Sequence, residues 1–246
     1  MAAPDRNDGI GRWYRPAMVG LSLLGLGLAA WLLAIELAGG PVDWGLDFRH
    51  YLDGARRFLD TGSPYLPSDV AGSFRFSDET FLHPPISLYL FVPFLWLPAV
   101  LWWAIPLTVT GWCLWSWRPA PWTWPILALA AAWPRLHGAI AFGNTDMWVL
   151  AAVTAGLQFG WPALMIVIKP SLGFLVIAGI RHRSWWLGWI VVALLCVPFT
   201  ALWGDWVRVV INSPGDLVYS IAPVPYLLAP VVAWVGRTRM RPEAVS

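Results

Sequence analysis

Residues 18–35 read MVGLSLLGLGLAAWLLAI and contain no charged side chain. A helix needs about 20 apolar residues to cross the hydrocarbon of a bilayer, so this run predicts a membrane span. It exceeds the roughly 7–15 residues of a signal-peptide core, and we therefore expect it to be retained. The rest of the chain agrees, since only 12% of its 246 residues are charged, against about 25% in an ordinary soluble domain.

The remaining apolar segments predict an all-α polytopic membrane protein, a single integral membrane domain over residues 1–246 with about eight transmembrane helices. Several segments are short and interrupted by proline, which is tolerated where neighbouring helices or a cavity satisfy the freed backbone groups. The stretch from Pro134 to Asp146 predicts a broken or re-entrant element. The expected spans are 17–38, 84–99, 100–117, 122–141, 146–160, 161–180, 185–203 and 220–236.

The arginines predict the orientation of these spans in the cell membrane, because cytoplasmic segments carry an excess of Lys and Arg. With the N-terminus inside, nine arginines, Arg135 among them, fall on the cytoplasmic side, and six, including Arg118, fall outside. Both termini are therefore expected in the cytoplasm. The predicted segments outside the membrane are a cytoplasmic N-terminus at 1–16, an extracytoplasmic loop at 39–82, a shorter outer loop near 204–219 and a cytoplasmic tail at 237–246.

The loop at 39–82 carries 11 of the chain's 30 charged residues. Within it, Phe48, Leu52, Ala55 and Leu59 repeat at helical spacing, which predicts an amphipathic juxtamembrane helix lying along the membrane surface with its apolar face down.

Its ends and its ion pairs are also predicted by the residues. Asp47 is a plausible N-cap, and Gly62 followed by Pro64 is a stop signal. Arg49 with Asp53, and Asp53 with Arg57, form i,i+4 pairs that favour the helix.

Asp47 is the first candidate for chemistry. As an N-cap it would have only a small role in stability, whereas as a general base it would act at the boundary between membrane and water. The two roles are compatible, because a cap also fixes the position of the carboxylate. Asp43, four residues earlier, is a secondary candidate.

Three further residues could contact a ligand. His83, in His83-Pro84-Pro85, could bind a phosphate or assist proton transfer, or it could be an exposed loop histidine. Lys169, the only lysine, lies in a predicted span, where a cation usually pairs or faces a cavity. An anionic ligand such as a lipid phosphate would suit it; the alternative is snorkelling to an interface. Asn144 and Asp146 form a polar notch at a helix start, where Asp146 complements the helix dipole.

Other kinds of site have no support in the sequence. The spacing of a zinc site, a P-loop, a nucleotide-binding glycine motif and a nucleophile elbow are all missing. Cys113 and Cys196 both lie in apolar runs, so neither a disulfide nor a metal–thiolate site is implied. The basic residues are dispersed, which argues against nucleic-acid binding. No metal and no cofactor are expected.

The order of the motifs resembles the C-type glycosyltransferases, and more narrowly glycosyltransferase family 87, whose members depend on polyprenol-phosphate-mannose. The similar pieces follow an N-terminal span and cover roughly residues 15–185. His83 stands where the family commonly has tyrosine, and the chain is shorter than typical relatives. The pieces are Asp47-Phe48-Arg49-His50-Tyr51-Leu52-Asp53-Gly54-Ala55, Gly62-Ser63-Pro64-Tyr65, His83-Pro84-Pro85, Pro93-Phe94, Leu97-Pro98, Gly143-Asn144 and Lys169-Pro170.

The resemblance implies an inverting transfer of mannose or another sugar from a polyprenyl-phosphate donor to an extracytoplasmic lipid or glycan acceptor. Such a reaction needs a base for the acceptor hydroxyl and cations for the leaving phosphate. Asp47 would be the base. Lys169 would bind the phosphate, with His83 or Arg49 as further candidates. Asn144 and Tyr51 are additional candidates for substrate contacts.

Two other functions stay open. Broken helices and an intramembrane lysine also suit a transporter or flippase-like protein, although no inverted repeat is visible. The short length would fit a non-catalytic membrane subunit that works with another membrane protein. Membrane lipids are expected partners in each case.

Overall fold

The computed structural model describes residues 8–38, 43–75, 77, 79–214 and 222–238. Within these ranges the chain is helical and forms no strand, apart from an isolated bridge between Pro119 and Arg237. The all-α prediction is confirmed for this part of the chain. The predicted termini and loops lie partly outside the described residues: 1–7 of the N-terminus, 39–42, 76 and 78 of the first loop, 215–219 of the second, 220–221 of the last span and 239–246 of the tail.

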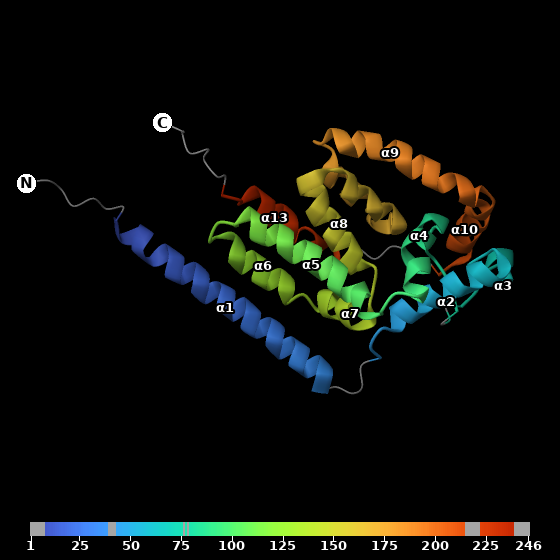
Figure 1. Ribbon diagram of the computed structural model, residues 1–246. Coiled ribbons are helices and arrows are strands. Elements are labelled where there is room, and N and C mark those ends of the chain that lie inside the picture. The colour runs from blue at the N-terminus through green and yellow to red at the C-terminus, as the bar shows by residue number, and fades with distance from the viewer. Residues whose placement is uncertain (1–7, 39–42, 76, 78, 215–221, 239–246) are drawn as a thin grey trace, which may run out of the picture.

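The elements follow one another from α1 to α13 (Figure 1). They are α1 (Asp8–Ala38), α2 (Leu46–Thr61), α3 (Pro67–Ala71), η1 (Pro85–Ser87), α4 (Leu88–Phe91), η2 (Val92–Leu95), α5 (Val100–Trp117), α6 (Thr123–Ala131), α7 (Pro134–Phe142), α8 (Asp146–Phe159), η3 (Trp161–Ile168), η4 (Pro170–Gly179), α9 (Arg183–Cys196), η5 (Val197–Phe199), α10 (Thr200–Asn212), α12 (Val224–Leu227) and α13 (Ala229–Val235).

Two helices among the described residues are long and apolar enough to cross a membrane, namely Trp13–Ile35 and Arg183–Asn212. Two further candidates are helix pairs bent at a short break, so the total is two to four. The chain thus has the apolar helices of a membrane protein. The bent pairs are Pro85–Leu95 with Val100–Trp117, at 117°, and Thr123–Ala131 with Pro134–Phe142, at 54°. The second bend confirms the predicted broken element at Pro134.

The predicted outer loop near 204–219 is wrong over its first half. Helix α10 continues to Asn212, so residues 204–212 are helical. Its start at Thr200 follows the short helix η5 around Pro198. Proline sits at the first turn of η5, where its missing N–H is tolerated. The apolar run therefore passes into an amphipathic helix without a loop.

Helix α8 is the centre of the molecule, with α5, α13, η3 and η4 around it (Figure 1). Its residues from Asp146 to Gly156 are all buried. A helix that is apolar all round belongs in a core, and its alanines and Gly156 let neighbours approach closely. A Cβ on Gly156 would lie 2.6 Å from the Cβ of Ala163 in η3.

Helix α2 confirms the predicted amphipathic helix but differs from the prediction at its start. Gly45, with φ of 74°, is the N-cap, and Asp47 lies in the first turn, so the N-cap assignment of Asp47 is wrong. Gly45 permits this left-handed conformation because it has no Cβ, and its N–H donates to O of Ala141 at 2.8 Å. The helix ends at Gly62 as predicted, with φ of 83°.

The apolar face of α2 is buried in protein instead of facing a membrane surface. Phe48, Tyr51, Leu52 and Ala55 belong to a core shared with α4, η2 and α5. The ion pairs also differ from the predicted i,i+4 set. Arg49 pairs with Asp43, and Arg56 pairs with Asp53 at 2.7 Å.

Arg118 and Arg237 lie at the same end of the molecule. The Oγ1 of Thr238 donates to O of Arg118 at 2.9 Å, and Pro119 bridges to Arg237. Since α5 runs from the α2 end of the molecule to this one (Figure 1), Arg118 is opposite the predicted outer loop. The assignment of Arg118 to the same side as α2 is therefore wrong. The predicted span at 84–99 is not a separate crossing, because Pro85–Leu95 is one arm of a bent pair with α5.

Gly54→Ala should destabilise the fold by about 1–3 kcal/mol, the usual cost of overpacking. A Cβ on Gly54 would lie 2.1 Å from Cδ2 of Phe81, in the segment that leads to His83. The measurement is thermal unfolding of the full chain in detergent.

Gly111→Ala in α5 is the matched control, because no atom lies within 4 Å of its added Cβ. Equal stability of the two variants would contradict the packing of Phe81 on α2.

Candidate functional site

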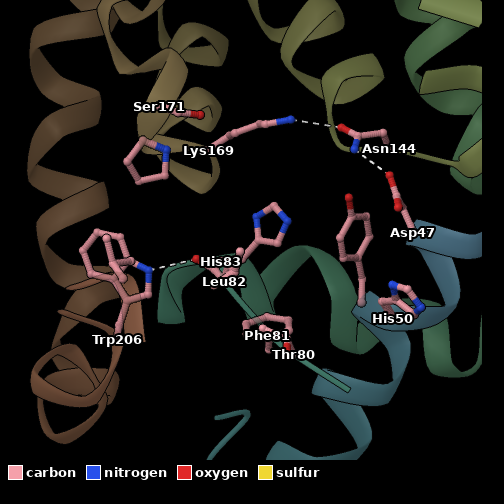
Figure 2. A pocket seen from close by; sticks show the side chains of 13 residues that line it. Asp47, His50, Thr80, Phe81, Leu82, His83, Asn144, Lys169, Ser171 and Trp206 are labelled. Carbon is pink, nitrogen blue, oxygen red and sulfur yellow. Dashed lines mark hydrogen bonds between the residues drawn. The ribbon is translucent and has the colours of Figure 1, made fainter. Parts of the chain in front are cut away.

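A cavity of about 250 Å³ lies between the start of α2, the segment 80–83, the junction of η3 with η4, and α10. Figure 2 shows Asp47, Asn144 and Lys169 pointing toward one another from segments that are far apart in the sequence. The polar side chains that line it include Asp47, His50, Tyr51, His83, Asn144 and Lys169.

Asn144 joins the two charged residues of the cavity. Its Nδ2 donates to Oδ2 of Asp47 at 2.6 Å, and its Oδ1 accepts from Nζ of Lys169 at 3.0 Å (Figure 2). The same Oδ1 accepts the backbone N–H of Asp146 at 3.0 Å, a local bond that satisfies an N-terminal donor of α8. The amide is thus held in one orientation, with its donor toward the carboxylate and its acceptor toward the ammonium.

The backbone around Asn144 is fixed by its neighbours. Gly143 ends α7 with φ of 71°, a conformation that glycine adopts without strain. Its O accepts from Nε1 of the buried Trp102 at 2.7 Å. The N–H of Asn144 donates to O of Ala139 at 2.8 Å. The predicted polar notch is therefore a rigid turn between α7 and α8.

Lys169 lies at the break between η3 and η4, where its φ of −132° and ψ of 80° interrupt the helical backbone. Its Nζ forms an ion pair with Oδ1 of Asp146, whose other oxygen accepts from the hydroxyl of Tyr226 at 3.1 Å. The lysine side chain is only 22% exposed. Lys169 is thus directed into the protein and paired there, as expected for a cation among apolar helices.

His83 and Tyr51 form an aromatic wall of the cavity. Nδ1–H of His83 donates to O of Ile168 at 3.0 Å, and its ring meets that of Tyr51 edge-to-face at 4.9 Å. Burial lowers the pKa of His83 to about 4, so the imidazole is neutral at pH 7. With Nδ1 protonated, the neutral ring presents Nε2 as an acceptor.

The surroundings of Asp47 shift the pKa of its carboxyl group. Burial raises its pKa above the ordinary value, against the opposing effects of the Asn144 hydrogen bond and the positive charges of His50 and Lys169. A carboxylate whose pKa lies closer to the working pH accepts a proton more effectively. Burial also raises the pKa of Tyr51 well above 10, so its hydroxyl stays protonated.

Arg49 and Asp43 do not line the cavity. They pair with each other, and Arg49 also donates to O of Trp44 at 2.7 Å. Their side chains are 50% and 60% exposed. The structure therefore brings together five of the seven sequence candidates and leaves these two at the surface.

Sequence reasoning missed the contacts of three residues. The sequence predicts only a role at the helix dipole for Asp146, yet this residue is the ion-pair partner of Lys169. Tyr226 reaches Asp146 from α12, and no local signal marks it. Trp206 lines the cavity from α10 and donates Nε1–H to O of Leu82 at 3.0 Å. The one usable signal was charge balance, since a buried lysine requires an acidic partner.

Among the described residues, no three His, Cys, Asp or Glu side chains lie together as a candidate metal-ion site.

Comparison with known proteins gives no match: no protein-family model fits the chain, and no curated protein or solved structure is similar to it.

Asp47→Asn should gain stability relative to the parent as the pH rises from about 4. A raised native pKa stabilises the fold below the unfolded pKa, and this contribution is lost as the pH rises through the native pKa. The amide of the variant does not titrate, so its contribution to stability does not fall as the pH rises. The measurement is the unfolding temperature of both proteins between about pH 4 and pH 8.

Asp53→Asn, on the exposed face of α2, should show no such gain. A pH-independent difference between parent and Asp47→Asn would contradict the burial of a charged Asp47.

Proposed function

We propose that the chain is a membrane glycosyltransferase that moves a sugar from a polyprenyl-phosphate donor to an extracytoplasmic lipid or glycan acceptor. The observation that carries the proposal is the meeting of Asp47 and Lys169 at Asn144 in one cavity. A base and a cation that line the same small cavity suit transfer to a hydroxyl with a phosphate leaving group. The order of motifs that resembles glycosyltransferase family 87 agrees with this chemistry.

In the proposed reaction Asp47 takes the proton of the acceptor hydroxyl. The oxygen forms a bond to the anomeric carbon as the bond from that carbon to the phosphate oxygen breaks. The polyprenyl phosphate leaves with the electron pair. Attack opposite the leaving group inverts the anomeric configuration, as in inverting hydrolysis. The raised pKa of Asp47 supports its role, and its hydrogen bond to Asn144 holds the carboxylate in place.

Lys169 would bind the departing phosphate, and its ion pair with Asp146 affects how the phosphate binds. The ammonium already has a carboxylate partner, so a phosphate must share it or displace Asp146. The pairing also holds the lysine side chain extended toward the cavity when no donor is bound. His83, neutral and with Nε2 as an acceptor, suits a sugar hydroxyl better than a phosphate.

An apolar groove beside the cavity offers room for the polyprenyl tail. Its volume is about 510 Å³, and it lies between α4, η3 and α9. Ile168 lines the groove, while its O accepts the hydrogen bond from His83 of the cavity. The tail would lie among apolar side chains while the phosphate points toward Lys169, so a lipid donor fits both spaces at once.

The proposed topology has about eight membrane crossings, with the short and bent helices counted as part of them. The cavity end faces outward and the end with Arg118 and Arg237 faces the cytoplasm. The observed position of Arg118 supports this orientation. Arg118 lies at the same end as Arg181 and Arg183, and cytoplasmic segments carry an excess of basic residues.

Asp47→Asn should lower sugar transfer by about 10²- to 10⁴-fold, the usual contribution of a general base. The amide keeps the shape of the side chain but does not accept a proton. The assay is transfer from radiolabelled polyprenyl-phosphate mannose, and from other polyprenyl-phosphate sugars, by the purified chain in detergent.

Asp43→Asn is the matched control, since Asp43 lies outside the cavity. Equal transfer by the parent and Asp47→Asn would sink the catalytic assignment. Uptake into proteoliposomes that needs Lys169 but not Asp47 would favour the transporter.

Lys169→Gln should lose donor binding and also about 3–5 kcal/mol of stability, because it leaves Asp146 charged and unpaired. Asp146→Asn combined with Lys169→Gln removes both charges and should recover most of the stability. Donor binding should remain lost in the double variant. Titration with polyprenyl-phosphate sugar, alongside thermal unfolding, separates the two effects; recovery of binding in the double variant would show that Lys169 has only a structural role.

A further inference from the structure

A second groove lies at the opposite end of the molecule from the cavity. It has a volume of about 680 Å³, within the usual range of ligand pockets. Helix α8 contributes Val153 and Leu157 to it, and it is bounded by η4 and α13, which pack around α8 (Figure 1). Neither the cavity nor the groove beside it shares a lining residue with it.

The rims of this groove are apolar and open. Ile177 of η4 is 63% exposed and Val235 of α13 is 69% exposed. Phe174 and Leu228 are 51% and 40% exposed on the same two sides. Exposed apolar side chains on both rims suit hydrocarbon better than water, so the groove can take an acyl chain along its length.

The mouth of the groove is basic. Arg181, His182 and Arg237 line it, and among the described residues none that lines the groove is acidic. The guanidinium of Arg237 lies 3.7 Å from the ring centroid of Trp234, which positions it at the end of α13. The Nε2–H of His182 donates to O of Leu157 at 3.1 Å, which ties the segment that carries Arg181 to α8.

This combination selects one ligand chemistry. Arginine binds phosphate oxygens through paired N–H donors, while the apolar rims bind a chain. Basic pockets between transmembrane helices on the cytoplasmic side bind anionic head groups. A zwitterionic lipid also carries a cation, which would lie beside the arginines, so it should bind less tightly than an anionic lipid.

We propose that the groove between η4 and α13 binds an anionic phospholipid, with its acyl chain along α8 and its phosphate at Arg181 and Arg237. The site is separate from the transfer cavity and does not depend on the reaction proposed there. The lipid fills a gap between helices and thereby stabilises the bundle at its basic end.

The test measures lipid binding by the full chain in detergent, with native mass spectrometry and thermal unfolding. Phosphatidylglycerol should bind at least about tenfold more tightly than phosphatidylcholine and should raise the unfolding temperature more. The double variant with Arg181→Gln and Arg237→Gln should lose this preference, because two phosphate contacts together exceed the 1.4 kcal/mol that corresponds to a tenfold change.

Arg183→Gln is the matched control, since Arg183 is exposed at the same end but does not line the groove. It should bind phosphatidylglycerol as the parent does. If Arg183→Gln lost the preference for phosphatidylglycerol as fully as the double variant does, the preference would reflect the overall positive charge of this end. That result would overturn the proposed site.

Three further outcomes would also overturn the proposal. The first is equal binding of the two lipids by the parent. The second is a dimer that forms without lipid and dissociates in the double variant, which would assign the groove to a second copy of the chain. The third is full competition by inorganic phosphate at millimolar concentration, which would show that the acyl chain adds nothing.

Discussion

The ion pair between Lys169 and Asp146 connects the parts of the structure that form the cavity. A cation among apolar helices is costly unless a carboxylate and hydrogen-bond acceptors surround it. Satisfying Lys169 fixes the break between η3 and η4 against the N-terminus of α8. Asn144 then transmits the arrangement to Asp47 at the start of α2. Three segments that are distant in the chain, around Asp47, Asn144 and Lys169, are thereby held at one place.

The apolar packing around α8 allows this polar arrangement to exist. Alanine and glycine on α8 permit close contact with η3, and the aromatic side chains of Phe48, Trp102 and Trp148 fill the space behind Asn144. A hydrogen bond beside such apolar packing is electrostatically stronger than one at the surface. The raised pKa of Asp47 and the lowered pKa of His83 follow from the same burial.

The two ends of the molecule thus differ in chemistry. One end carries the cavity with its carboxylates and the amphipathic helix α2, and the other carries arginines around an apolar groove. A membrane protein meets different surroundings on its two faces, with anionic lipid in the cytoplasmic leaflet. The proposed transfer reaction at one end and the proposed lipid site at the other are both consistent with a single orientation.

The sequence by itself determined the helical class, the apolar segments, helix α2 with its end at Gly62, and five of the residues that line the cavity, because periodicity and composition are local properties. The sequence also indicated that Lys169 requires a polar or anionic partner, but it did not identify that partner. Only the tertiary structure decided that Asp146 and Tyr226 supply the partners, that Arg49 turns to Asp43 and that Arg118 lies opposite α2. The reason is physical: a buried polar group takes the partner that packing brings within about 3 Å, and sequence separation does not constrain that choice.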